Sequence, residues 1–414
     1  MGLLDFFKRI EPDKKASPFL HTAYDAFFTL FYSPDSVNKD GVHLRDGMDL
    51  KRTMVMVVIA MQLCYVFGTW NIGHQHFVAL GEHTDLLAGL HLKIAYGLIQ
   101  ILPIFVVTHV VGLGIEFFYA YKKGHSVEEG FLVSGALIPL IMPPDIPLWI
   151  LALAVAFAVW IGKEAFGGTG MNILNIALLA RVFVFFAYPT EISGDQVWIA
   201  GLEASGAADY SWWHTGLFNG LFEAFGWSTF NEGAATVDGF SGATPMILAY
   251  QGGWEAVTAS YTPSQMWWGT IPGSIGETSK PLIIVGALLL VAMGIASWRI
   301  MMSMFIGAVT MALLLNAWGA TPFMEVPWYY QFYMGSFFFA MAFMATDPVT
   351  ASSTNKGKWI YGFLIGFIGM IIRVLNPAYP EGWMLAILFM NVFAPLIDYY
   401  VLEGHVAKRL KRAA

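Results

Sequence analysis

Long apolar runs alternate with short polar segments along most of the chain after residue 52. A helix that crosses the hydrocarbon core of a bilayer needs about 20 residues. One long apolar stretch is interrupted by Pro143-Pro144-Asp145-Ile146-Pro147, because proline removes a backbone donor and blocks helix continuation. The runs predict ten membrane-spanning helices, near residues 54–72, 94–121, 130–142, 147–162, 171–187, 281–297, 300–318, 328–346, 359–374 and 382–402.

The charged residues predict how these helices cross the membrane. Residues 1–52 contain eight Lys or Arg, whereas residues 188–279 contain nine acidic residues and no Lys or Arg. Lys and Arg are retained on the cytoplasmic side of membrane proteins. The pattern therefore predicts that both termini are cytoplasmic and that the acidic segment is periplasmic.

Five predicted spans precede the acidic segment and five follow it, which predicts two inverted repeats, as in urea-transporter-like folds. Paired breaks, Pro143-Pro144-Asp145 and Thr346-Asp347-Pro348, fall at corresponding positions of the two halves. The predicted organisation comprises a cytoplasmic N-terminal arm (1–52), transmembrane repeat 1 (53–187), a periplasmic segment (188–280), transmembrane repeat 2 (281–402) and a basic cytoplasmic tail (403–414).

Composition supports an all-α integral membrane protein. Hydrophobic residues make up 57% of the chain and charged residues 12%, about half the charged fraction of soluble domains. The single cysteine, Cys64, excludes an intrachain disulfide and a cysteine-ligated iron–sulfur cluster. Redox chemistry in this chain would have to use flavin, quinone or haem. The aromatic cluster at Tyr24–Phe28 predicts either an interfacial amphipathic stretch or an ordinary polar extension.

The periplasmic segment contains Asp238-Gly239-Phe240-Ser241-Gly242-Ala243-Thr244. These residues resemble the flavinylation motif of membrane redox complexes, in which FMN is joined to the last Thr by a phosphodiester bond. Such a bond needs an exposed hydroxyl, a flexible backbone and small neighbours, which Gly239, Gly242 and Ala243 provide. The alternative interpretation is a plain Gly/Ser turn.

A second polar segment, Gly167-Gly168-Thr169-Gly170-Met171-Asn172-Ile173-Leu174-Asn175, opens the fifth predicted span. Helix N-termini offer unpaired N–H groups, and two Asn side chains three residues apart would share one helix face. Asn172 and Asn175 could hydrogen-bond a flat polar ring such as isoalloxazine. The alternative is a capped helix start in which the amides pack between helices.

Four carboxylates lie in or near the predicted spans. Ionisable groups inside a bilayer are costly and are candidates for function. They are Glu116, Asp145, Asp347 and Asp398. Arg181 is the cation expected to pair with one of them. His109 is expected to be a packed histidine, and oxygen ligands of this type suit Na⁺.

Several further motifs carry a resemblance over nearly the whole chain. They are Asp49–Arg52, Val127–Phe131, Lys163–Gly170, Ile271–Glu277, Met344–Pro348 and Arg373–Gly382, together with the 238–244 motif. With them, the chain resembles the B-subunit family of the bacterial Na⁺-translocating NADH:quinone oxidoreductases.

The resemblance implies covalent FMN at Thr244, with Asp238, Ser241, Gly242 and Ala243 around it, and noncovalent riboflavin near Asn172 and Asn175. It implies a quinone site at Gly112, Leu113 and Glu116, and a Na⁺ pathway through Glu116, Asp347 and Asp398. Electrons from NADH, oxidised on another subunit, would pass through these flavins to ubiquinone and drive Na⁺ export. The partners would be the A, C, D, E and F subunits of a six-subunit complex in the bacterial inner membrane, with lipid and quinone and without nucleic acid.

Three alternatives stay open. The nearest is the D subunit of the Rnf electron-transport complex, a shorter relative with the same flavinylated loop, although the basic arm and the long outer segment favour the quinone reductase. A urea-type channel would conduct a solute and bind no flavin. A structural membrane subunit would assemble with a vestigial motif.

Overall fold

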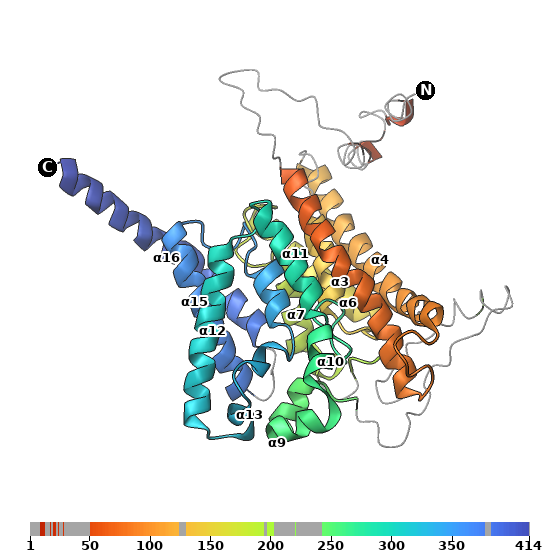
Figure 1. Ribbon diagram of the computed structural model, residues 1–414. Helices are drawn as coiled ribbons and strands as arrows, with labels where there is room; N and C mark the ends of the chain where they lie inside the picture. The colour runs from red at the N-terminus through yellow and green to blue at the C-terminus, as the bar shows by residue number, and fades with distance from the viewer. Residues whose placement is uncertain are drawn as a thin grey trace.

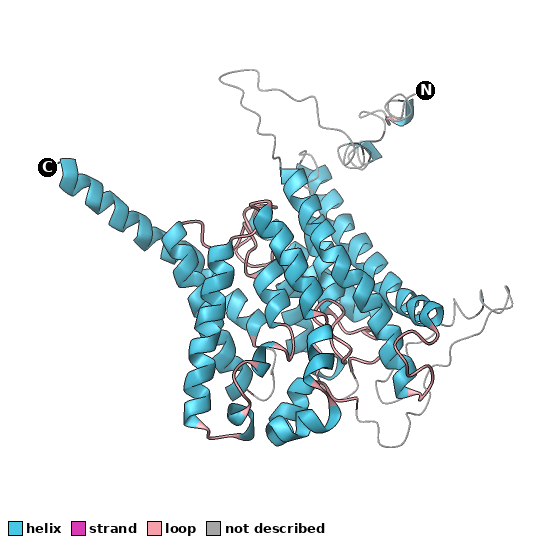
Figure 2. Ribbon diagram, in the orientation of Figure 1, coloured by secondary structure: helices cyan, strands magenta, loops and turns pink. Residues whose placement is uncertain are grey.

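The computed structural model describes residues 9–12, 17, 20, 21, 24, 28, 50–123, 130–193, 197–202, 220, 242–376 and 382–413. Most of the predicted N-terminal arm lies outside these residues, as do Asp238 and Ser241 of the flavinylation-like motif. Helices and loops make up the described part of the chain (Figure 2). The prediction of an all-α protein is therefore confirmed for these residues.

The helices up to residue 191 are α3 (Leu50–Ala79), α4 (Leu90–Lys123), α5 (Phe131–Ile141), α6 (Leu148–Trp160), η1 (Glu164–Phe166), α7 (Ile176–Ala187) and η2 (Pro189–Glu191). Those that follow are α9 (Pro245–Ser260), α10 (Pro263–Trp268), α11 (Lys280–Ala292), α12 (Trp298–Trp318), α13 (Pro322–Glu325), η6 (Tyr330–Phe332), α14 (Phe337–Phe339), the π-helical η7 (Ala340–Met344), α15 (Asn355–Leu375) and α16 (Trp383–Ala413).

Each predicted span contains a helix, but the helices differ in length. Within the described residues, six stretches are long and apolar enough to cross a membrane, and they involve α3, α4, α6, α12, α15 and α16. Three shorter apolar helices, α5, α7 and α11, accompany them. Six apolar helices of this length indicate an integral membrane protein.

Three predicted spans contain helices clearly shorter than the hydropathy pattern indicated. In the span predicted at 281–297, α11 ends at Ala292. The span predicted from residue 171 begins only at Ile176, because residues 171–174 form a turn and a bend and Asn175 caps the helix. The 12 residues of α7 extend about 18 Å, less than the bilayer core. The prediction of one continuous helix over residues 328–346 is wrong. This range contains three short helical elements instead: η6, α14 and η7.

The proline-rich break has the predicted effect. Helix α5 ends at Ile141, and α6 begins directly after Pro147. The intervening backbone is mostly buried, and the carboxylate of Asp145 accepts a hydrogen bond from Gly201 N at 2.7 Å. Non-helical backbone at membrane depth is tolerated where protein surrounds it.

The helices pack as two neighbouring groups (Figure 1). In one group α4 contacts α3, α5 and α6, and α6 contacts α7; in the other α12 contacts α15, and α15 contacts α16. The two groups meet where α3 contacts α11 and where α7 contacts α16. The buried side chains form one large core that spans both groups.

The last part of the acidic segment is buried between the helices. Residues 271–279 form no helix and are buried throughout. Gly276 N donates to Leu140 O at 2.8 Å, and Asn71 Nδ2 donates to Ile271 O at 3.0 Å. These contacts join the segment to α5 and α3, so it is part of the helical body.

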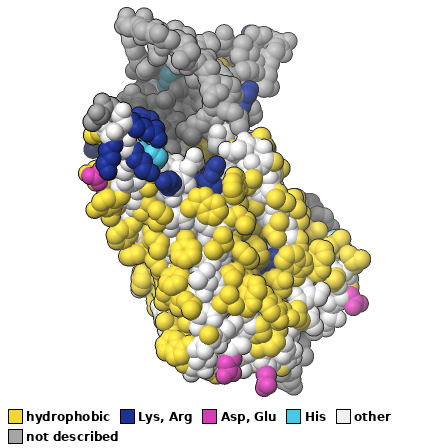
Figure 3. Space-filling model, turned by 60° about the vertical axis from the view of Figure 1, so that its left-hand side comes forward, with side chains coloured by type: hydrophobic (Ala, Val, Ile, Leu, Met, Phe, Trp, Pro, Cys, Tyr) yellow, Lys and Arg dark blue, Asp and Glu magenta, His cyan; other side chains and the backbone are white. Residues whose placement is uncertain are grey.

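Basic and acidic side chains gather at different ends of the surface. In Figure 3 a broad hydrophobic band lies between one end, where Lys and Arg gather, and the opposite end, where Asp and Glu are visible. Helix α16 continues without a break through the predicted basic tail to Ala413 and projects from the body (Figure 1). Its residues 402–412 are exposed.

Candidate functional site

Thr244 is the residue that precedes the first turn of α9. Its backbone is extended, Pro245 occupies the first helical position, and the Thr244 side chain makes no capping hydrogen bond. Gly242, with φ of 63°, and Ala243 are buried, and Thr244 is half-buried. Tyr261 Oη donates to Ala243 O at 2.9 Å and holds this backbone against the far end of α9. The hydroxyl is thus presented by a restrained backbone with small neighbours.

A pocket of about 750 Å³ adjoins this backbone at Gly242. Its wall combines hydrogen-bonding and aromatic side chains from α3, α10 and the connecting loops. Among the lining residues are His74, Gln75, Asp85, Tyr261, Gln265 and Trp268. The volume lies within the range of small-molecule pockets, about 300–1,000 Å³.

A buried lysine that the sequence analysis missed lies next to this pocket. Lys93 is fully buried, and its Nζ lies 3.0 Å from His74 Nδ1 and donates to Asp85 O. Because an ammonium can only donate, His74 accepts at Nδ1 and carries its proton on Nε2. Lys93 immediately precedes the span predicted at 94–121 and belongs to no recognisable motif, so nothing in the sequence indicated its burial.

Asn172 and Asn175 line one cavity, but they do not share a helix face as predicted, because both precede α7. Asn172 Nδ2 donates to Leu174 O at 3.1 Å. Asn175 Oδ1 accepts from Leu178 N at 3.2 Å, and its Nδ2 donates to Asp347 Oδ2 at 3.2 Å. The cavity, of about 80 Å³, is also lined by Asp347 and Lys163.

Asp347 lies in the loop between η7 and α15, opposite α7. Besides Asn175, its carboxylate accepts from Val349 N at 3.1 Å and from Thr350 Oγ1 at 3.0 Å. The hydrogen bond from Asn175 joins residues that are 172 positions apart in the chain. Asn172 and Asn175, predicted to bind riboflavin, therefore line the same cavity as Asp347, one of the three residues predicted for the Na⁺ path.

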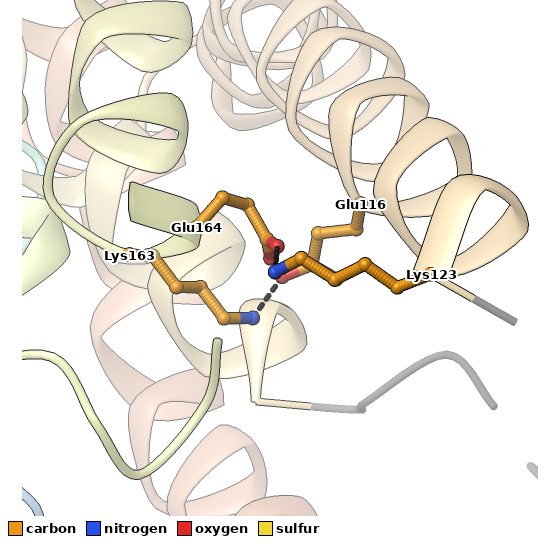
Figure 4. A network of polar contacts seen from close by, with 4 residues as sticks. All are labelled: Glu116, Lys123, Lys163 and Glu164. Carbon is orange, nitrogen blue, oxygen red and sulfur yellow. Dashed lines mark hydrogen bonds and ion pairs between the residues drawn. The ribbon is translucent and has the colours of Figure 1, made fainter. Parts of the chain in front are cut away.

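Glu116 is paired with Lys163, not with Arg181. The Lys163 ammonium donates to Glu116 Oε1, and the two side chains are only 4% and 3% exposed (Figure 4). A second pair lies beside it: Lys123 Nζ is 3.4 Å from Glu164 Oε2. Glu116 and Lys123 lie two turns apart on α4. Their partners, Lys163 and Glu164, are consecutive residues of the segment after α6.

Gly112 lies one turn before Glu116 on the buried face of α4, whereas Leu113 is half-buried. A β-carbon added at Gly112 would collide with the ring of Phe131 at the start of α5. Gly112 therefore allows α4 and α5 to approach closely. His109, one turn earlier, packs against Phe105 and Phe131.

Asp398, on α16, binds the start of α15. Its Oδ1 accepts from Ser352 Oγ at 2.7 Å and from the backbone and hydroxyl of Thr354; its Oδ2 accepts from the backbone and hydroxyl of Ser353 at 2.7 and 3.1 Å. A carboxylate at a helix N-terminus satisfies unpaired N–H groups and interacts favourably with the helix dipole.

Two buried arginines bind backbone carbonyls and aromatic rings. Arg181 donates to Ile141 O and lies 5.2 Å from the Trp198 ring centroid. Arg373 donates to Gln331 O and Met334 O and lies 4.8 Å from the Trp383 ring centroid. Both guanidinium groups thus bind carbonyls at the end of a helix or at irregular backbone.

These features define a polytopic membrane protein with polar and charged sites between its helices. The sequence matches the NQR2, RnfD, RnfE family over residues 37–406, and the chain belongs to this family. It is 42% identical to the B subunit of the Na⁺-translocating NADH-quinone reductase of Chromohalobacter salexigens, over 100% of this chain and 97% of that protein. It is 41% identical to the protein of the same name of Ectopseudomonas mendocina over 100% of both chains, and 40% identical to that of Pseudomonas aeruginosa strain LESB58 over 94% and 93%.

Proposed function

We propose that the chain is a membrane subunit of a Na⁺-translocating NADH:quinone reductase, and that it carries electrons toward ubiquinone in a complex that exports Na⁺. The observation that carries the proposal is the identity of at least 40% over almost the whole chain to proteins of that name. The other subunits of that complex would be its partners. This chain would carry electrons within the membrane, whereas NADH would be oxidised on another subunit.

The proposed topology has ten helical segments in two inverted repeats, with both termini in the cytoplasm of a bacterial inner membrane. Matching contacts between the helices support the repeats. The pairs α4–α6, α6–α7 and α3–α5 in the first half correspond to α12–α15, α15–α16 and α11–α14 in the second. The Lys- and Arg-rich end in Figure 3 supports a cytoplasmic side on which α16 ends.

The residues at Thr244 suit a covalent FMN. Small buried neighbours leave space at the hydroxyl, the hydroxyl is not used as a helix cap, and the pocket at Gly242 has the volume of a ligand site. Trp268 and Tyr261 offer aromatic surface and Gln265 offers polar groups to a ring system. When bound, a flavin accepts and passes on electrons; the protein supplies its attachment and surroundings.

The residues at Asn172 and Asn175 suit riboflavin chemically. Amides, the Asp347 carboxylate and Lys163 supply donors and acceptors for the edge of a polar ring. The cavity of about 80 Å³ is smaller than ordinary ligand pockets. Riboflavin would therefore enter only if the lining side chains separate, and its binding would be coupled to movement between α7 and the loop at Asp347.

The proposed quinone site lies on α4 at Gly112, Leu113 and Glu116, and the proposed Na⁺ path uses Glu116, Asp347 and Asp398. Carboxylate and hydroxyl oxygens are hard ligands that suit an alkali cation. Glu116 lies within the cluster of two ion pairs drawn in Figure 4. Asp398 would have to exchange hydrogen bonds from Ser353 or Thr354 before it could bind a cation.

Inverted membrane vesicles that contain the assembled complex test this function. NADH and ubiquinone should drive ²²Na⁺ uptake that a protonophore does not abolish. Uptake driven only by reduced ferredoxin and NAD⁺ would favour the alternative of an Rnf D subunit. Solute flux without electron transfer would favour the urea-type channel, and unchanged uptake after Thr244→Val would favour a structural subunit with a vestigial motif.

A further inference from the structure

The Glu116–Lys163 pair is the most deeply buried ion pair among the described residues. Glu116 lies on the buried face of α4, two turns before the C-terminal end of the helix, and Lys163 lies three residues after the end of α6. The neighbouring Lys123–Glu164 pair is closer to the surface, because the Lys123 side chain is 37% exposed. The Glu116–Lys163 pair is therefore the more buried of two adjacent pairs. Its acidic residue lies on α4, whereas in the Lys123–Glu164 pair the basic residue does.

Burial determines what can replace Lys163 at Glu116. An ionised carboxylate in a poorly solvated site requires a cation close to it, and removal of one partner leaves an uncompensated charge. Na⁺ carries the same charge as the lysine ammonium and prefers oxygen ligands. Exchange of the ammonium for Na⁺ would therefore keep the site electrically neutral.

The Lys163 ammonium has an alternative acceptor nearby, in a neighbouring cavity. Lys163 lines the cavity that contains Asn172, Asn175 and Asp347. Its four-carbon stem is flexible, and its ammonium can reorient among acceptors. Asp347 also lines this cavity, and its carboxylate offers an acceptor there.

We propose that Lys163 is a tethered cation that occupies Glu116 until Na⁺ displaces it toward the Asp347 cavity. The inference rests on the proposed role of Glu116 in Na⁺ entry and adds a positioning residue to it. Each Na⁺ that binds at Glu116 moves one positive charge toward the cavity next to Asn172 and Asn175. Ion entry is thereby linked physically to the proposed riboflavin site.

Competition by Lys163 lowers the apparent affinity of Glu116 for Na⁺. A site that is available in only a fraction of molecules binds its ligand more weakly by that fraction. If the pair is closed in about nine-tenths of molecules, Lys163→Met should decrease the half-saturating Na⁺ concentration about tenfold. Lys163→Arg, which retains the charge, should leave it unchanged or increase it.

The test uses the purified assembled complex and labelling of Glu116 by a hydrophobic carbodiimide, quantified by peptide mass spectrometry at increasing Na⁺ concentrations. Carbodiimides react with the protonated carboxyl group, so bound Na⁺ protects it. Lys163→Met should increase labelling without Na⁺ and shift half-protection to lower Na⁺. Lys122→Met removes an exposed lysine from the same helix as Glu116, so it is the matched control and should keep the wild-type half-protection value. Lys163→Gln replaces the Met variant if that complex does not assemble.

The possible outcomes distinguish an error in the role of Lys163 from an error in the proposed role of Glu116 in Na⁺ binding. If Na⁺ protects wild-type Glu116 but the neutral Lys163 variants leave half-protection within about twofold of wild type, the tethered-cation role is wrong. If Na⁺ does not protect Glu116 in any variant, and Glu116→Gln does not alter the Na⁺ dependence of quinone reduction, the proposed role of Glu116 itself is wrong.

Discussion

Asn175 Nδ2 donates to Asp347 Oδ2 at 3.2 Å, while Asn175 Oδ1 caps α7 through Leu178 N. One amide thus joins the start of α7 in the first half of the chain to the loop before α15 in the second. The two halves share a cavity at this point. A single residue can therefore affect both helix stability and the chemistry of the cavity.

Asn175→Ala should weaken both functions of this amide. Loss of an N-cap typically costs about 1 kcal/mol, and the Asp347 carboxylate loses a donor. Thermal unfolding of the detergent-solubilised complex should move to lower temperature, and retained riboflavin, measured after acid extraction, should decrease. The matched control, Asn172→Ala, removes the hydrogen bond to Leu174 O and leaves the cap of α7 intact. An equal loss of stability in the two variants would contradict this assignment.

Asp398→Ala should destabilise the start of α15. It removes a carboxylate that accepts hydrogen bonds from Ser352, Ser353 and Thr354. Hydrogen bonds to charged groups contribute about 1.5–3 kcal/mol each, so a loss of at least about 2 kcal/mol is expected. Hydrogen exchange of α15 amides measures it directly. Asp398→Asn should retain part of the capping, and unaltered exchange in the Ala variant would show that the cap is dispensable.

Gly112→Ala separates packing from ligand binding at the proposed quinone site. The new methyl group would meet the Phe131 ring, and overpacking typically costs about 1–3 kcal/mol. A second change, Phe131→Leu, should restore stability because it removes the ring. If quinone reduction recovers together with stability, Gly112 acts through helix packing. If stability recovers and quinone reduction does not, the glycine contacts the quinone.

The backbone next to Thr244 should loosen at high pH. Burial raises the pKa of Tyr261 above its ordinary value of 10.0. The folded state therefore retains the phenol proton where the unfolded chain has lost it, so the stabilisation is complete below about pH 10 and declines as pH rises through the folded pKa. Proteolysis near residue 243 should accelerate above pH 10 in the wild type. Tyr261→Phe should abolish this pH dependence, and an identical pH profile in both proteins would contradict the role of Tyr261.

Hydropathy predicted most helices because lipid-facing and core residues are both apolar. The proline-rich break was predicted correctly, since proline acts locally on the backbone. The start of α7 was predicted five residues too early. Hydropathy does not distinguish Met171, Ile173 and Leu174, which lie in a turn and a bend before the helix cap, from helical residues. The sequence also did not predict that residues 328–346 form three short elements. Their aromatic side chains can pack equally well from a helix or from a turn.

The charge pairing within the site could not be predicted from local sequence. Glu116 and Lys163 are 47 positions apart, and only the packing of α6 against α4 brings them together. Arg181 is the cation that the sequence favoured for one of the four carboxylates, but Glu116 binds Lys163, and the Arg181 guanidinium donates to the Ile141 carbonyl. The polar segment at 271–279 gave no sign of burial, because its backbone bonds depend on Leu140 and Asn71, far away in the chain.

The central claim, that Thr244 carries covalent flavin, is tested most directly by in-gel ultraviolet fluorescence of the denatured chain, expressed with a flavin transferase. Thr244→Val removes the hydroxyl, and Thr258→Val is the matched control on the same helix. A fluorescent band should appear in the wild type and in Thr258→Val and should disappear in Thr244→Val. Fluorescence that persists in Thr244→Val, or a wild-type chain without fluorescence, would contradict the claim.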